Sequence, residues 1–108
     1  MENKLQPQDL RIGNYVKRNG MVVQVDHKTF WDVKNKPTEY ESIPLTEEWL
    51  LKFGFVYNEE YNSYMNNGFI VEKIGDLFLD RRYGKVIKTV NALQNFYNVV
   101  TDKELTIK

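Results

Sequence analysis

Few residues of this chain have the type and spacing of a catalytic centre. His27 is the one histidine of the sequence and lies between Asp26 and Lys28. General acid–base catalysis needs a second titratable group within hydrogen-bond reach, whereas a single histidine at a strand end is more often a solvated turn residue. Ser42 and Ser63 are the two serines, and neither has the sequence setting of a nucleophile elbow. The sequence therefore predicts neither a histidine-based nor a serine-based enzyme.

Two pairs of adjacent acids, Glu47–Glu48 and Glu59–Glu60, have the composition of a hard-metal or glycosidase site. Neighbouring residues of a helix point about 100° apart, however, and the first pair suits the positive end of a helix dipole. Because the sequence has no cysteine, disulfides and sulfur-ligated zinc sites are excluded. The six glycines do not have the spacing of a phosphate-binding loop. We expect no catalytic residue, no metal site and no cofactor.

A basic segment without acids follows Asp80. Its residues are Arg81, Arg82, Tyr83, Lys85 and Lys88. Guanidinium and ammonium groups bind phosphates, and an exposed tyrosine ring stacks on unpaired bases. Lys17, Arg18, Lys28 and Tyr15 would extend this patch if the N-terminal hairpin lay beside it. The segment is either a solvated basic turn or a local contact for nucleic acid.

An acidic and aromatic segment carries the opposite charge. Between Glu39 and Glu60 the sequence has six acids and one base. Tyr57, Tyr61 and Tyr64 lie around Glu59 and Glu60, and exposed tyrosines are good interface anchors because they lose little side-chain entropy on binding. Carboxylates here could replace phosphates in the groove of a nucleic-acid-binding protein. The alternatives are ordinary solubilising charge and a core position for at least one of the tyrosines.

Length and composition limit the class of protein. The chain has 108 residues and a mass of 12.9 kDa, which predicts a single domain over residues 1–108. Lys plus Arg and Asp plus Glu both number 15, so the zero net charge argues against a chain that coats nucleic acid. The N-terminus lacks the apolar core of a signal peptide, and no run approaches the roughly 20 apolar residues of a membrane span. We expect a cytoplasmic protein without a membrane partner.

The N-terminal part predicts strands. Asn19–Gly20 favours a type I′ turn that joins strands at 14–18 and 21–26 into a hairpin. The register puts Val16, Met21, Val23 and Val25 on its core face. A third strand is expected at 29–33, followed by a loop over 34–41.

The rest of the chain alternates helix, strands and helix. Thr46 and Gly54 have the positions of an N-cap and a C-terminal glycine for a helix over about 46–53. Four strands of a central meander are expected at 55–57, 63–65, 69–74 and 77–80. Apolar residues from Val86 to Val100 recur at helical spacing and predict a helix over about 89–101, with a short strand at 104–107. The predicted class is α+β, with a mostly antiparallel sheet and two helices.

Several segments resemble those of an uncharacterised family of short proteins from bacterial phages, prophages and other mobile elements. They are Leu10–Val16, the I-P-L-T-E-E-W-L-L-K-F-G-F segment at 43–55, Leu93–Tyr97, and the E-L-T-I segment at 104–107. These motifs are structural and carry no catalytic residue. The sequence departs from the family at 88–92, where an aromatic residue and a histidine often stand.

The resemblance implies a non-catalytic accessory protein, since small proteins of such elements often inhibit host defence, as anti-CRISPR proteins do. We expect it to bind a host protein, most concretely a CRISPR-type nuclease or its ribonucleoprotein, in the bacterial cytoplasm. The residues expected to contact the partner are Tyr57, Glu59, Glu60, Tyr61, Tyr64, Arg81, Arg82, Tyr83, Lys85 and Lys88. The alternative is a small RNA- or DNA-binding domain with an SH3-like N-terminal hairpin region. A small hydrolase or a virion component comes third.

Overall fold

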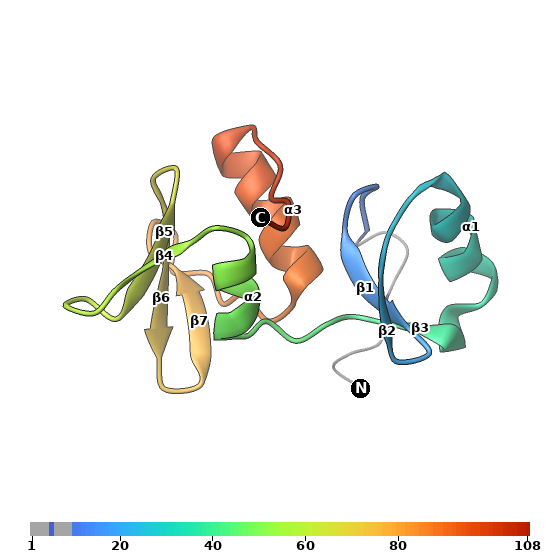
Figure 1. The fold of residues 1–108 in the computed structure, drawn as a ribbon, viewed down its shortest axis with the longest axis horizontal. Coiled ribbons are helices and arrows are strands. Elements are labelled where there is room, and N and C mark those ends of the chain that lie inside the picture. The colour runs from blue at the N-terminus through green and yellow to red at the C-terminus, as the bar shows by residue number, and fades with distance from the viewer. Residues whose placement is uncertain (1–4, 6–9) are drawn as a thin grey trace.

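The computed structural model describes residue 5 and residues 10–108. Within these residues the fold is α+β, with two antiparallel sheets and three α-helices (Figure 1). The first sheet has the order β2-β1-β3, from β1 (Tyr15–Arg18), β2 (Met21–Gln24) and β3 (Tyr40–Glu41). The second has the order β4-β5-β6-β7, from β4 (Val56–Asn58), β5 (Ser63–Asn66), β6 (Phe69–Ile74) and β7 (Leu77–Asp80). The helices are α1 (His27–Asn35), α2 (Glu47–Lys52) and α3 (Val90–Thr101).

The predicted N-terminal hairpin is confirmed. Asn19 and Gly20 have φ angles of 49° and 85°, as the two central residues of a type I′ turn require. Val16 pairs with Val23 and is fully buried, as expected. Met21 was predicted on the core face but is 71% exposed. Met21 pairs with Arg18 beside the turn. The smaller core is covered by Val16, Val23 and Val25, which lie farther from the turn.

The predicted strand at 29–33 is wrong, because these residues belong to α1. The carboxylate of Asp26 accepts hydrogen bonds from the N–H and from the hydroxyl of Thr29, both at 2.8 Å, which satisfies a free amide of the first turn. Phe30 and Val33, three residues apart, pack in the N-terminal core. This spacing fits one face of a helix and not one face of a strand.

The predicted loop at 34–41 and the predicted strand at 104–107 are also wrong. The predicted loop at 34–41 contains the end of α1, a 3₁₀ turn η2 (Pro37–Glu39) and β3, which pairs with β1. The segment 104–107 is not a strand in the structure. It follows α3 back toward α2, and the N–H of Lys108 donates to the carbonyl of Lys52 at 2.8 Å. The number of helices in the described chain is therefore three, not two.

The central meander and both predicted helices are confirmed. Thr46 accepts a hydrogen bond from the Trp49 N–H at 3.3 Å, and Thr89 accepts one from the Ala92 N–H at 3.2 Å. Each threonine thus caps its helix as the sequence predicts. The helical spacing includes Val86 in the apolar stripe of the last helix, but Val86 lies before α3 and bridges to β7.

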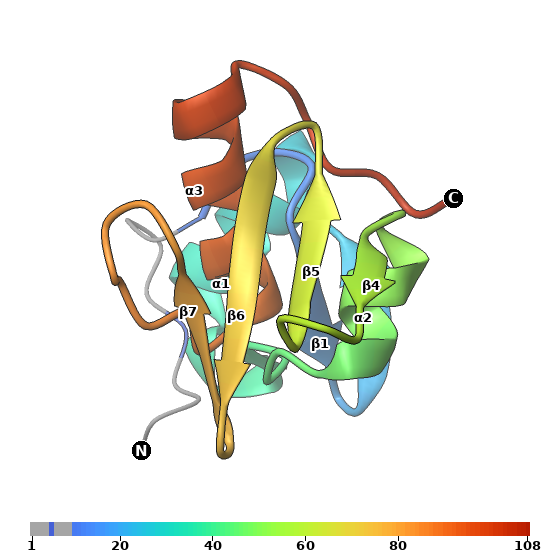
Figure 2. The same cartoon turned by 90° about the vertical axis from the view of Figure 1, so that its left-hand side faces the viewer.

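Helices α2 and α3 cover one face of the four-stranded sheet and lie between it and the N-terminal sheet (Figure 1). The larger core forms there, and its fully buried side chains are Leu50, Phe53, Tyr64, Val71, Val90, Leu93 and Tyr97. A smaller core lies between the N-terminal sheet and α1. Figure 2 looks onto the other face of the four-stranded sheet, with the helices behind it.

A buried polar network joins α3 to the N-terminal hairpin. The side-chain oxygen of Gln94 accepts the Tyr15 N–H at 2.8 Å, and its amide nitrogen donates to the Gly13 carbonyl at 3.0 Å. Asn14 is buried as well and donates to Asn95 Oδ1 at 2.9 Å. Because buried polar groups are costly without partners, these bonds fix the hairpin on one side of the helix.

Arg11 extends this network toward the surface. Its Nε donates to Asn95 Oδ1 at 2.9 Å, and its Nη1 lies 3.0 Å from Glu104 Oε2. The segments 10–16, 93–97 and 104–107, three of the four on which the resemblance was stated, therefore meet at one joint. The hydrogen bonds and the ion pair between these segments hold the N-terminal hairpin against α3.

Gln94→Leu is expected to lower the free energy of unfolding by about 2 kcal/mol, because it leaves the Tyr15 N–H buried without its acceptor. Urea unfolding measures the effect. Gln24→Leu is the matched control, since Gln24 is exposed and also donates to the Gly13 carbonyl. It should change the free energy by less than about 0.5 kcal/mol. Equal losses in the two variants would contradict the structural role of Gln94.

The cap of α1 should make stability depend on acid pH. The hydrogen bonds from the backbone N–H and the hydroxyl of Thr29 hold the pKa of Asp26 below its ordinary value of 3.8. This stabilisation is complete above pH 3.8 and is lost as the pH falls through the lower folded-state pKa. The melting temperatures of wild type and Asp26→Ala should therefore differ at pH 6 and converge in strong acid. Asp76→Ala, in the β6–β7 turn, serves as the control.

Candidate functional site: a basic groove beside helix α3

The loop after β7 is held in a fixed shape by Asp80. Its buried carboxylate accepts the N–H groups of Arg82 at 3.3 Å and Tyr83 at 2.6 Å. Gly84 takes a positive φ of 68°, and its N–H donates to the Asp80 carbonyl at 2.8 Å. Val86 then bridges back to Leu79. The loop therefore presents its side chains from a defined backbone and not from a mobile turn.

Two of these side chains meet α3 at Phe96. The Tyr83 ring is 65% exposed, and its centroid lies 5.9 Å from that of Phe96. Lys85 Nζ lies 5.3 Å from the Phe96 ring centroid, within the range of a cation–π contact. An exposed tyrosine, a half-buried phenylalanine and an ammonium group thus form one surface.

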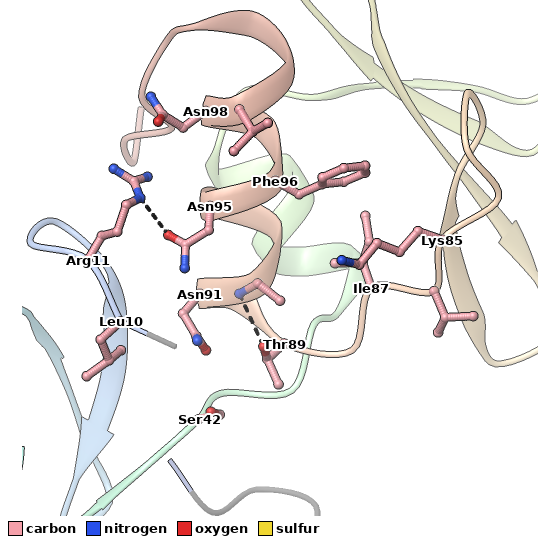
Figure 3. A pocket seen from close by; sticks show the side chains of 13 residues that line it. Leu10, Arg11, Ser42, Lys85, Ile87, Thr89, Asn91, Asn95, Phe96 and Asn98 are labelled. Carbon is pink, nitrogen blue, oxygen red and sulfur yellow. Dashed lines mark hydrogen bonds between the residues drawn. The ribbon is translucent and has the colours of Figure 1, made fainter. Parts of the chain in front are cut away.

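This surface belongs to a groove along α3. A hollow of about 530 Å³ and a second of about 440 Å³ share Lys85, Phe96 and Val99 as lining residues. The second shares Arg82 and Val100 with two smaller hollows toward β6. Figure 3 shows the first hollow, with Arg11 on one side of α3 and Lys85 on the other.

The groove is basic at its edges and apolar on its floor. The cations that line it are Arg11, Arg82, Lys85 and Lys103. Among the described residues that line the groove, Asp80 is the single acidic one. Its carboxylate already accepts two backbone N–H groups. Glu104 pairs with Arg11 at one edge. Phe96, Val99 and Val100 form the apolar part, and Val99 is 79% exposed.

The structure divides the predicted basic segment. Arg82, Tyr83 and Lys85 lie together in the groove. Arg81 turns to the outer face of the sheet, where its Nε lies 3.4 Å from Glu72 Oε2 and its guanidinium lies 5.9 Å from the Tyr61 ring centroid. Lys88 is exposed before α3 and outside the residues that line the groove.

The predicted acidic and aromatic segment forms the β4–β5 turn. Glu59, Glu60 and Tyr61 are exposed there, and the Glu60 N–H donates to Asn58 Oδ1 at 3.0 Å. Tyr57 is partly exposed, and its hydroxyl donates to Asn62 Oδ1 at 2.8 Å. This turn therefore presents two carboxylates and a ring at one corner of the sheet.

Tyr64 is a correction to this predicted surface, because it is fully buried in the larger core. Its ring centroid lies 4.9 Å from that of Tyr57, and its hydroxyl donates to the carboxylate of Glu47. Burial, with the hydrogen bond to Glu47, raises the pKa of the Tyr64 hydroxyl. Tyr64 thus links α2 to the sheet and is not available as an anchor for a partner.

The hairpin does not extend the basic groove. Tyr15 packs on Trp49 and Phe53, with ring centroids 5.7 and 5.9 Å away. Arg18 Nη2 lies 3.0 Å from Glu39 Oε1. Both side chains are therefore engaged in the fold itself.

The residues first considered for catalysis lie apart. His27 is exposed at the start of α1, and Ser63 is buried in β5. Ser42 lines the larger hollow. Glu47 and Glu48 occupy the first turn of α2. Over residue 5 and residues 10–108, no group of three acidic or histidine side chains is arranged to hold a metal ion.

Sequence reasoning missed four residues of the groove: Arg11, Phe96, Val99 and Lys103. A signal was present for two of them. The core stripe of α3 contains Val90, Leu93 and Tyr97, and apolar residues outside such a stripe are candidates for binding. Val99 is of this kind, and Phe96 lies at the edge of the stripe, where it also packs on Phe69. Arg11 and Lys103 come from distant parts of the chain, and only the tertiary fold brings them to the groove.

Comparisons with protein-family models, curated proteins and solved structures found no match to this chain. None of the described helices is long and apolar enough to cross a membrane. The groove geometry is consequently the main support for a functional proposal.

Proposed function

We propose that the protein is a non-catalytic binding protein that holds single-stranded nucleic acid in the basic groove. The observation that carries this proposal is the arrangement of Arg82 and Lys85 around an exposed aromatic and apolar floor. Cations contact phosphates, and a ring such as that of Tyr83 stacks on a base whatever its sequence. Of the functions predicted from the sequence, this was the alternative.

The apolar floor favours a single strand over a duplex. In a duplex the faces of the bases are stacked inside, so an exposed Tyr83 ring and Val99 side chain would gain little from contact. An unpaired nucleotide offers the face of its base to the ring and its phosphate to the cations. Since the whole chain has no net charge, binding should be confined to the groove and should weaken with salt.

Arg82→Glu/Lys85→Glu is expected to weaken binding of a short labelled RNA or DNA strand by about tenfold or more. The double substitution reverses two charges at the groove, so the slope of log K against log salt should also become shallower. Fluorescence anisotropy across a salt series measures both effects.

The matched control is Lys28→Glu/Lys88→Glu, which makes the same change in net charge at exposed positions outside the groove. It should lower affinity much less. Equal losses in the two double variants would indicate diffuse attraction, and equal affinity for a duplex of the same sequence would contradict single-strand selection.

A second candidate is an inhibitor that docks on a host CRISPR-type nuclease or its ribonucleoprotein. The exposed carboxylates of Glu59 and Glu60 beside Tyr61 favour it, because such a turn complements a basic nucleic-acid channel. The resemblance to proteins of mobile elements adds support. In this function the β4–β5 turn would occupy the channel sterically and electrostatically.

Glu59→Lys/Glu60→Lys is expected to weaken a complex with such a ribonucleoprotein by about tenfold or more, because it places like charges in a basic channel. Affinity capture with the purified nuclease and guide RNA measures this. Arg82→Glu/Lys85→Glu should leave this complex intact. If only the groove variant weakens it, the acidic turn is not the docking element.

A further inference from the structure

Two turns of the molecule contain a chemically reactive pair of residues. Asn19–Gly20 joins β1 to β2, and Asn67–Gly68 joins β5 to β6. These are the two Asn–Gly pairs of the sequence. In such a pair the backbone nitrogen of the glycine can attack the side-chain amide of the asparagine, because glycine has no side chain to shield that nitrogen. The reaction releases ammonia and modifies the asparagine.

The backbone is the same in both turns. Asn19 and Asn67 have φ angles of 49° and 50°, and Gly20 and Gly68 have φ angles of 85° and 79°, as the centre of a type I′ turn requires. The space around both glycines is open, since a Cβ on either would meet no described atom within 4 Å. A difference in reactivity must therefore come from the asparagine side chains and from how firmly each turn is held.

The side chain of Asn67 is tied to the larger core. Its Nδ2 donates to the Tyr97 hydroxyl at 2.8 Å, and this hydroxyl donates to Asn66 Oδ1 at 3.3 Å. Tyr97 is 1% exposed, and Phe69, which follows the turn, is buried as well. To reach the nitrogen of Gly68, the amide of Asn67 has to rotate away from Tyr97 and lose this hydrogen bond.

The side chain of Asn19 has no such anchor. Its backbone N–H donates to the Glu39 carbonyl at 3.0 Å, but no residue in the described part of the chain bonds to its exposed side-chain amide. Met21, which follows this turn, is 71% exposed. The amide is thus free to rotate toward the nitrogen of Gly20, and a turn without contacts to a core opens more easily.

We infer that Asn19 is a site of spontaneous deamidation and that the Tyr97 hydroxyl protects Asn67 from the same reaction. At Asn19 the Gly20 nitrogen forms a bond to Cγ, and its proton leaves with the amide group as ammonia, so that a cyclic succinimide remains. Water then adds to one of the ring carbonyls and opens the ring. The product is aspartate or its β-linked isomer isoaspartate, and either one adds a negative charge.

The protection of Asn67 keeps a carboxylate out of the basic groove. Asn67 lines one of the smaller hollows together with Arg82 and Lys103. A negative charge there would weaken the attraction of these cations for a phosphate. Asn19 lies between the strands of the N-terminal sheet, outside the residues that line the groove. The inference does not depend on the proposed function, because both reactions need only the protein and water.

Peptide mass spectrometry of the full chain, incubated at mildly alkaline pH, measures the rates at the two sites. In folded wild type Asn67 should react at least about fivefold more slowly than Asn19, which is the factor given by one hydrogen bond of ordinary strength. In concentrated urea the two rates should be similar, because both turns are then open. This comparison is the internal control for the intrinsic reactivity of the two pairs.

Tyr97→Phe removes only the hydroxyl and should raise the rate at Asn67 about fivefold, with no change at Asn19. Equal rates at the two sites of folded wild type, or an unchanged rate at Asn67 in Tyr97→Phe, would overturn the inference. Circular dichroism checks that the variant is folded. The comparison within wild type needs no substitution, so it decides the inference even where Tyr97→Phe is unstable.

Discussion

The position of α3 depends on the buried amide of Gln94. This side chain bonds to the backbone of Gly13 and Tyr15 at the hairpin and, at 3.4 Å, to the carbonyl of Leu105 after the helix. An amide that is 1% exposed has no water to replace those partners. The two sheets have separate cores, so this network, with Asn14 beside it, supplies directional contacts that apolar packing alone lacks.

Helix α3 contacts the four-stranded sheet on one side and the N-terminal hairpin on another, and its third side faces the solvent. Val90 and Leu93 pack into the larger core, and Gln94 faces the joint. Phe96 and Val99 are left on the remaining side, where Tyr83 and Lys85 approach from the loop after β7. The exposure of apolar side chains on this side is a consequence of how the other two sides of the helix are used.

The elements that the sequence predicts correctly are those decided by neighbouring residues. Asn19–Gly20 determines the first hairpin, and Thr46 and Thr89 begin α2 and α3. The segment 29–33 has β-forming residues, yet the cap at Asp26 and the docking of one face on a core favour helix. Arg11 reaches the groove because it lies beside Asn95, 84 positions away in the sequence. Only tertiary packing brings the two residues together.

Arg81 and Arg82 show how adjacent residues of one charge come to serve different surfaces. The alternation of β7 continues through Arg81, which joins Leu77 and Leu79 on the outer face and pairs with Glu72. Arg82 falls in the turn fixed by Asp80 and lines the groove.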